Sequence, residues 1–198
     1  MEELDFDVIV VGGGPAGSSA ARMAAENDCT VVLIEKENEI AETVRTSGVT
    51  WISDIEKIGI PDEYYNPIKK FSFCSPKNSV KISDDVAKAA VLDVRKTYKF
   101  LAQRARNTGV KIFLGTNVTD VLRDSTGKCI GVIAKSHDSQ IQFNGKVIID
   151  ASGFASVVAK ELGYVKQWKK FGVGAEFEVK TEKLEYDNWW LMVGQEYS

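Results

Sequence analysis

A glycine-rich turn lies between the first apolar run of this sequence and a segment rich in helix-forming residues. The turn holds Gly12, Gly14 and Gly17 in the spacing G-x-G-x-x-G, directly after residues 7–11. The first glycine allows a tight turn, the second lets a pyrophosphate approach the backbone, and the third lets helix and strand pack closely. The helix N-terminus adds free N–H groups and a positive dipole end. The sequence therefore predicts a dinucleotide phosphate site here.

The second apolar run supports this interpretation, because an isolated glycine motif is a weak signal. Residues 30–34 are apolar and end in Glu35, close to the ~20-residue offset of the acid that binds a ribose 2′-OH. A carboxylate there accepts hydrogen bonds from ribose hydroxyls and repels a 2′-phosphate, which disfavours a ligand of the NADP type. The alternative is an ordinary βαβ unit with a glycine-rich turn.

Composition narrows the class of protein. Apolar residues make up 44% and charged residues 27% of the 198, which is typical of a globular protein with a sizeable core. A net charge of −3 gives no reason to expect a nucleic-acid partner. Cys29, Cys74 and Cys129 are widely spaced and predict neither a disulfide framework nor a metal site, which favours a cytoplasmic location. We expect neither a signal peptide nor a transmembrane helix.

The pattern after Glu35 predicts a long polar loop and then several short elements. The loop ends near Arg45, Thr46, Ser47 and Gly48. These residues either approach a ligand, as residues of long loops often do, or belong to a solvated loop in which Thr50 or Ser53 is the N-cap of the next helix. The elements expected after it are a helix over 51–58 stopped by Gly59, a hairpin of 71–75 and 79–83, a strand over 90–92 and a helix reaching Gly109.

Alternating strands are expected in the next part of the chain. A strand over 110–114 precedes an antiparallel meander of 117–122, 129–134 and 140–143, and Asn144-Gly145 is expected to turn the chain into a strand over 146–149. The only histidine, His137, lies in a polar turn with no nucleophile placed for it, which argues against a hydrolase triad.

A second candidate ligand-binding stretch begins where that strand ends. Asp150 is followed by small residues up to Gly153, and a helix is expected to start near Ser156. Ligands bind at this edge of a parallel sheet. The alternative is a routine strand–helix joint with Ser156 as N-cap.

The last part of the sequence is expected to form the start of another sheet. Residues 164–171 mix bases with aromatic residues, so the segment is either a solvated linker or a contact with a membrane surface. Residues 172–179 and 189–193 are patterned as strands.

These motifs together resemble the flavoprotein superfamily of p-hydroxybenzoate hydroxylase, and within it the geranylgeranyl reductase family. The resemblance rests on the stretch Gly12–Gly17, on Glu35-Lys36, on Asp150–Gly153, and on Leu92–Arg95 before a helix. It implies an α/β fold: a Rossmann-like FAD-binding βαβ sheet with an inserted antiparallel β-meander and the start of a substrate-domain sheet. It also implies that FAD is the cofactor. The candidate cofactor-binding residues are then Gly12, Gly14, Pro15, Ala16, Gly17, Glu35, Lys36, Arg45, Thr46, Ser47, Gly48, Arg95, Val118, Asp150 and Gly153.

The sequence departs from the family pattern in places. Thr46 stands where archaeal relatives often carry a cysteine, Ser152 replaces the aspartate of an Asp-Gly pair, and the family arginine aligns with either Val94 or Arg95. We expect an incomplete FAD-binding domain over 1–165, lacking a C-terminal Gly-Asp segment, and a truncated start of a substrate-binding domain over 166–198.

Three functions remain open from the sequence. The first is an FAD-dependent reductase that saturates isoprenoid double bonds of lipids. Its partners would be an apolar small-molecule substrate and NAD(P)H or a ferredoxin-like protein as electron donor. The protein would also contact a membrane as a peripheral protein. The second is a monooxygenase or halogenase-like flavoprotein on the same scaffold. The third is a catalytically silent, truncated fragment of an FAD-binding domain, which binds the ADP part of a dinucleotide weakly or not at all. No residue is assigned as catalytic.

Overall fold

The computed structural model describes residues 2–137, 139–165 and 185–194, together with 172, 174–175, 177, 180 and 182. The chain divides into two compact units, each built from two separate stretches of sequence. The first unit comprises residues 1–44 and 98–172, and the second comprises 45–97 and 173–198. The sequence predicts an FAD-binding domain over 1–165 and the start of a substrate-binding domain over 166–198. That division by function stays a prediction.

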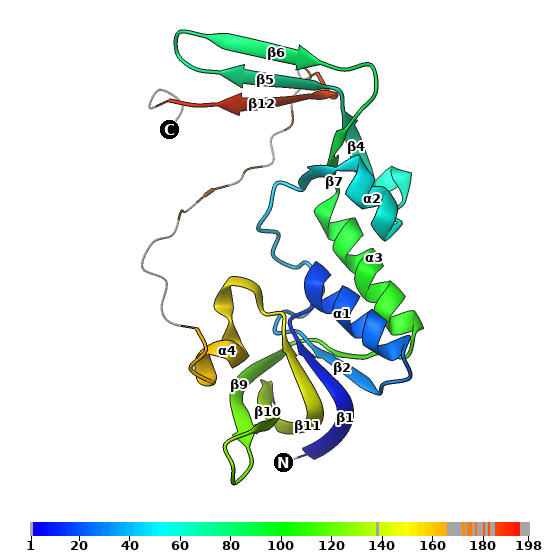
Figure 1. The fold of residues 1–198 in the computed structure, drawn as a ribbon, viewed down its shortest axis with the longest axis vertical. Coiled ribbons are helices and arrows are strands. Elements are labelled where there is room, and N and C mark those ends of the chain that lie inside the picture. Colours follow the sequence, from blue (N-terminus) through cyan, green and yellow to red (C-terminus); the bar gives the residue numbers. More distant parts are fainter. Residues whose placement is uncertain are drawn as a thin grey trace. The chain divides into compact units, whose positions relative to one another are not determined.

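A six-stranded sheet forms the centre of the first unit (Figure 1). The first four strands in spatial order pair in parallel and the last two pair antiparallel. Their order across the sheet is β8 (Lys111–Phe113), β2 (Val31–Ile34), β1 (Glu2–Val11), β11 (Ser139–Asp150), β10 (Cys129–Ser136) and β9 (Thr116–Arg123). The Rossmann-like sheet with an inserted antiparallel meander, predicted from the sequence, is confirmed.

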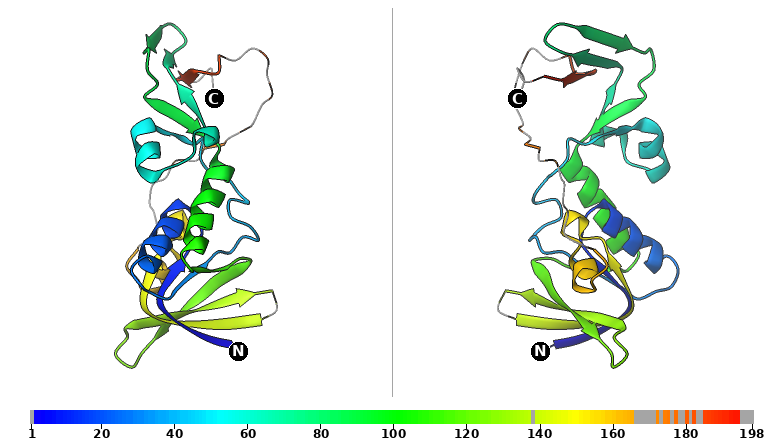
Figure 2. Two further views of the ribbon diagram at one scale, coloured as in Figure 1. Left: turned by 90° about the vertical axis from the view of Figure 1, so that its right-hand side faces the viewer. Right: turned by 60° about the vertical axis from the view of Figure 1, so that its left-hand side comes forward.

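Helices cover both faces of this sheet, which is why β1 and β2 are apolar throughout their buried parts. On one face, Val10 and Leu33 pack with Ala21 of α1 (Pro15–Ala25) and Ala105 of α3 (Val94–Asn107). On the other face, the core includes side chains from the meander and from α4 (Val157–Glu161), which follows a short 3-10 turn, Gly153–Ala155. Figure 2 shows α1 and α3 on the side of the sheet opposite α4. The helix expected before Gly109 is confirmed as α3, whose Leu101, Ala102 and Ala105 are buried.

The expected turn at Asn144-Gly145 is wrong, because β11 runs unbroken through both residues. Its first half pairs with β10, and nearly its whole length pairs with β1, from Ile141 to Asp150. A Cβ at Gly145 would lie 2.7 Å from the Cδ1 of Ile9, so the glycine permits close packing over β1. Sheet pairing thus overrides the turn preference of this dipeptide.

Two three-stranded sheets make up the second unit. The first has the order β3 (Val49–Trp51), β7 (Ala89–Leu92), β4 (Tyr65–Ile68), and the second β12 (Asn188–Met192), β5 (Lys70–Cys74), β6 (Ser79–Ser83). A 3-10 turn, Asp62–Tyr64, precedes β4. The predicted hairpin is β5–β6. Helix α2 (Ile52–Ile58) ends at Gly59, whose φ is +73°, as the sequence predicts. Neither Thr50 nor Ser53 caps it; the N-cap position is Trp51, without a side-chain bond.

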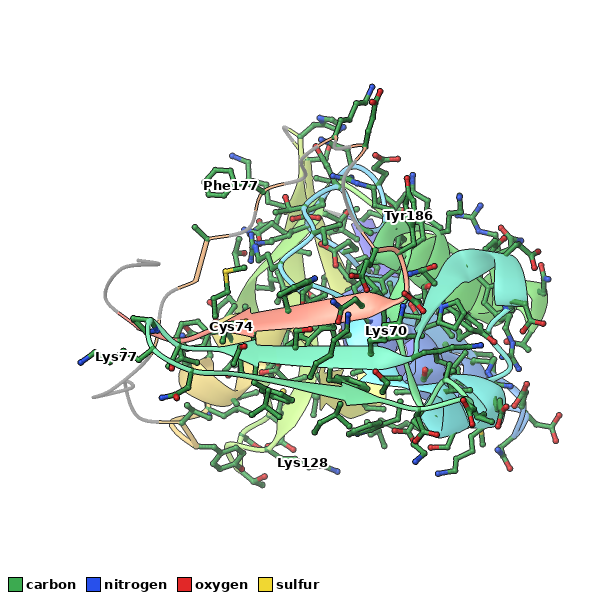
Figure 3. The ribbon with its side chains drawn as sticks, turned by 90° about the horizontal axis from the view of Figure 1, so that it is seen from above. Lys70, Cys74, Lys77, Lys128, Phe177 and Tyr186 are labelled. Atoms are coloured by element: carbon green, nitrogen blue, oxygen red, sulfur yellow. The ribbon has the colours of Figure 1, made fainter. Side chains whose placement is uncertain are left out.

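The expected strand near the end of the described chain is confirmed as β12, which pairs in parallel with β5 (Figure 3). The ring of Trp189 meets Phe71 and Phe73 edge-on, at centroid distances of 6.2 and 6.1 Å. Because side chains alternate along strands, one face of this sheet is wholly apolar. Its members are Phe71, Phe73, Val80, Ile82, Trp189 and Leu191.

Some expectations fall outside the described residues. Residues 173, 176, 178 and 179 of the strand expected over 172–179 lie outside them, as do residues 166–171 of the basic and aromatic segment 164–171. Within the part of the chain that is described, no helix is long and apolar enough to cross a membrane.

Candidate cofactor site

The turn between β1 and α1 requires glycine at its first and last positions. Gly12 has φ +108°, and its N–H donates to the carbonyl of Ile34 at 2.8 Å. A Cβ there would lie 2.4 Å from the carbonyl oxygen of Ala151, and a Cβ at Gly17 would lie 1.9 Å from that of Gly12. Both glycines therefore allow backbone segments to touch where a side chain would push them apart.

Gly14 differs from its neighbours because nothing lies within 4 Å of where its Cβ would be. It is the N-cap of α1, no side chain caps that end, and Pro15 occupies the first turn. The first turn also contains no acidic residue. Pro15 and Ala16 are exposed. The helix therefore presents an open, positively polarised end over a glycine that leaves room for a ligand, which fits a phosphate group.

Glu35 lies beside this turn, at the end of β2. Its Oε2 accepts a 2.6 Å hydrogen bond from the N–H of Gly13, and its Oε1 accepts one of 2.9 Å from the N–H of Glu37. Each carboxylate oxygen has a further lone pair for a ligand hydroxyl. Lys36, next along the chain, is exposed.

The third part of the site follows β11, where Asp150 holds the start of α4. Its Oδ1 accepts bonds from the hydroxyl of Ser152 at 2.5 Å and from the N–H of Ser152 at 3.1 Å. Its Oδ2 accepts from the N–H of Ala159 at 2.8 Å, and the hydroxyl oxygen of Ser152 accepts from the N–H of Val157 at 2.8 Å. The carboxylate and Ser152 together cap this short helix. Gly153, which follows, is exposed.

Ser156 does not act as the side-chain cap considered from the sequence. It occupies the N-cap position with φ +46°, but its side chain makes no capping bond. Its hydroxyl donates instead to the carbonyl of Gly153 at 3.3 Å.

The structure thus brings the glycine turn, Glu35 and the start of the 150–153 stretch together at the carboxyl ends of β1, β2 and β11. The N–H of Ala151 donates to the carbonyl of Val11 at 2.8 Å, and a Cβ on Gly12 would reach within 3.0 Å of the Cα of Ser152. This edge is where ligands bind in folds of this kind.

Five of the remaining candidates belong to the second unit. They are Arg45, Thr46, Ser47, Gly48 and Arg95, and all but the buried Gly48 are exposed. Gly48 has φ +74°, and its Cβ would lie 2.8 Å from Val94.

Val118 of the first unit is only 6% exposed, and its side chain packs in the core. The cofactor-binding roles expected for Val118, for the five candidates of the second unit and for the candidates around the glycine turn, Glu35 and Asp150 all stay predictions.

Sequence reasoning missed two parts of this site. One is Gly13, whose N–H fixes the Glu35 carboxylate. The other is Ser152, which caps α4 together with Asp150. A serine or aspartate a few residues before a helix is a capping signal, and that signal was available for Ser152.

Comparison with known proteins decides the family. A family model described as FAD dependent oxidoreductase matches residues 7–164. The chain belongs to this family. Its cofactor is FAD, and the resemblance to geranylgeranyl reductases read from the sequence is also confirmed by the relatives described next.

A digeranylgeranylglycerophospholipid reductase of Methanocaldococcus jannaschii is 33% identical over 192 residues, and the match covers 93% of this chain and 48% of that protein. A crystal structure of a geranylgeranyl bacteriochlorophyll reductase-like protein from Thermoplasma acidophilum has a TM-score of 0.79 at 23% identity, covering 98% of this chain and 51% of that one. A flavin-dependent brominase has a TM-score of 0.66 at 24% identity, covering 81% and 41%. The two structures share the fold, and the chain spans about half the length of the M. jannaschii relative.

Proposed function

We propose that this chain supplies the FAD-binding part of a reductase that saturates isoprenoid double bonds of lipids. The arrangement of Gly13, Gly14 and Glu35 carries the cofactor assignment, because it leaves an open helix end beside a fixed carboxylate. The reaction is inferred from the reductase of M. jannaschii, whose name states its lipid substrate. The partners we expect are an apolar isoprenoid substrate and NAD(P)H or a ferredoxin-like donor, with the protein cytoplasmic and at the periphery of a membrane.

The residues of the first unit account for binding of the adenosine half of the cofactor. The N-terminal N–H groups of α1 and the space over Gly14 would hold the pyrophosphate, and Glu35 would accept hydrogen bonds from the ribose hydroxyls. The negative charge of Glu35 disfavours a 2′-phosphate at the same place. Lys36 and Gly153 would border this half of the cofactor. Bound and reduced, the flavin would supply the hydride for the alkene.

A second reaction keeps the same cofactor site. The similarity to a flavin-dependent brominase favours a monooxygenase or halogenase-like activity as the alternative. Fold alone does not choose between the two reactions.

The first experiment asks whether the purified chain binds FAD. After incubation with FAD and removal of the unbound cofactor, we expect absorption bands near about 370 and 450 nm, as oxidised flavins show. A chain that remains folded by circular dichroism but retains no flavin would leave only the silent-fragment interpretation.

A second experiment separates the two reactions. The flavin-loaded chain is reduced chemically without oxygen and given a geranylgeranyl glycerolipid, whose mass is then followed. A gain of two hydrogens per saturated double bond supports the reductase. Halide incorporation into an aromatic acceptor in the presence of oxygen would favour the halogenase-like alternative.

A further inference from the structure

A second hollow lies in the first unit, apart from the cofactor site. Its volume is about 290 Å³, and it opens between the β9–β10 turn, the middle of β11 and the end of α4. Its lining includes three cationic side chains and an apolar floor, and none of these residues is a candidate for FAD binding. The members that matter here are Arg123, Lys128, Lys146, Ile148, Leu162 and Tyr164.

The positive charge of the hollow comes mainly from Arg123 and Lys128. One guanidinium nitrogen of Arg123 donates to the carbonyl of Glu161 at 2.6 Å, which holds the side chain in place and leaves its other N–H groups for a ligand. Lys128 is exposed, and its ammonium makes no ion pair with any residue that the structure describes. Figure 3 shows it at the outer edge of the view.

Acidic groups nearby reduce this charge without cancelling it. Asp7 pairs with Lys146 at 2.6 Å, so that lysine adds little excess charge. The carboxylate of Asp124 accepts from the N–H groups of Thr126 and Lys128, which turns it toward the backbone of the hairpin. Arg123 and Lys128 therefore remain as donors for an anion.

The floor of the hollow is apolar, which restricts the kind of anion. Ile148 and Leu162 pack against the core around Val158, which is 4% exposed. Tyr164 stands at the rim, 81% exposed. A free inorganic anion gains nothing from such a floor, whereas a phosphate joined to glycerol and hydrocarbon covers it. An exposed tyrosine at the rim is typical of a surface that meets a membrane interface.

We propose that this hollow binds the phosphate headgroup of an anionic membrane lipid. Its volume lies at the lower end of small-molecule sites, which suits a phosphate with its glycerol and the first carbons of the chains, while the rest of each chain stays in the bilayer. The contact places the first unit on the membrane surface through Arg123, Lys128 and Tyr164. It does not depend on the reaction proposed above.

Sedimentation with vesicles tests the proposal. The chain is mixed with phosphatidylcholine vesicles with or without phosphatidylglycerol, and we expect binding only to the anionic vesicles, weakened by salt. Each basic residue near an anionic surface raises the affinity for that surface by a factor of about five. The Arg123→Gln/Lys128→Gln variant should therefore bind the anionic vesicles about thirtyfold more weakly. Lys128→Gln alone breaks no ion pair among the described residues and should bind about fivefold more weakly, which keeps the test valid if the double variant unfolds.

The matched control is Lys77→Gln/Lys135→Gln, which removes two exposed positive charges that lie outside the hollow and make no ion pair with any described residue. It should leave vesicle affinity nearly unchanged; an equal loss in this control would overturn the proposal, because net charge alone would then explain binding. Tyr164→Ser should weaken vesicle binding while leaving any binding of glycerol phosphate intact.

Two further outcomes would also overturn it. Binding of glycerol phosphate without binding to anionic vesicles would identify a soluble phosphate ligand instead of a lipid. Equal binding to neutral and anionic vesicles would exclude phosphate recognition. Flavin absorption is recorded for every variant, so that a failure of lipid binding is distinguished from a failure of the cofactor assignment.

Discussion

The N–H of Gly13 donates a 2.6 Å hydrogen bond to the carboxylate of Glu35, a residue 22 positions later in the sequence. The bond joins the turn expected to face the phosphates to the acid expected to bind the ribose. The second oxygen of the carboxylate is held by the N–H of Glu37. Two parts of the cofactor site are thus fixed relative to each other before a ligand arrives, which reduces the entropy lost on binding.

Replacing Glu35 by glutamine should weaken FAD binding. One side of the carboxylate faces the Gly13 N–H and the other the Glu37 N–H, so the amide NH₂ of glutamine would meet a donor on either side. A hydrogen bond to a charged group contributes about 1.5–3 kcal/mol, and we expect affinity to fall by about ten- to a hundredfold. Flavin fluorescence titration measures it. Unchanged affinity would show that Glu35 does not bind the cofactor.

Two glycine substitutions should separate folding from binding. Gly17→Ala would place a Cβ 1.9 Å from the carbonyl oxygen of Gly12, and overpacking of this kind costs about 1–3 kcal/mol of stability. Gly14→Ala meets nothing within 4 Å and should fold at least as stably as the parent, yet bind FAD poorly because the methyl group occupies the phosphate space. Urea unfolding and flavin retention are measured together. Tight FAD binding by Gly14→Ala would contradict the assignment.

Asp150→Asn should destabilise the first unit even without cofactor. Both carboxylate oxygens accept hydrogen bonds, one from Ser152 and the other from Ala159. Asparagine replaces one of these acceptor oxygens by an NH₂ group, which would then face a donor. Leaving such a donor unpaired costs about 1–3 kcal/mol in the free energy of unfolding. The control is Ser156→Ala, which removes only the 3.3 Å contact with Gly153 and should have a smaller effect. Equal effects would mean that Asp150 does not hold α4.

Asp7 should make stability depend on pH in the acid range. Hydrogen bonds from Lys146 and Thr30 hold the pKa of its carboxyl well below the usual range. A carboxyl whose pKa is lower in the folded state stabilises the fold above its unfolded value, about 4, and the contribution is lost as pH falls toward the folded value. Asp7→Asn should therefore be less stable than the parent at pH 7, and the gap should narrow below about pH 4.

Urea unfolding at several pH values measures that gap. The control is Glu3→Gln, which replaces an exposed carboxylate on the same strand. A gap between Asp7→Asn and the parent that stays constant down to low pH would contradict the linkage.

The parts of the fold set by local pattern could be predicted from the sequence. The apolar runs of β1 and β2, the glycine turn between β1 and α1, and the stop at Gly59 all follow from residue types at short range. The unbroken β11 could not be predicted, because the turn preference of Asn144-Gly145 is overridden by pairing with β1. The parallel pairing of β12 with β5 brings together residues far apart in the sequence, such as Ser72 and Asn188, which are 116 residues apart. Nothing in the sequence of either strand specifies the other strand as its partner.

The candidate site divides in the same way. Glycine spacing and the position of Glu35 predicted which residues would hold the phosphates and the ribose, and these residues lie together in the structure. Short-range contacts did not indicate that Asp150 directs its oxygens to Ser152 and Ala159, because that depends on how α4 folds back over the end of β11.

The position of β1 between β2 and β11 has a consequence for the protein during its synthesis. The strand that carries the glycine turn leaves the ribosome well before its partner on one side, which spans Ser139–Asp150. At 5–20 residues per second, β1 waits on the order of ten seconds with one edge unpaired. An apolar strand held open for that time is a target for chaperones or for pairing with another nascent chain. Slowing translation between residues 35 and 139 should therefore lower the yield of folded protein more than slowing it after residue 150.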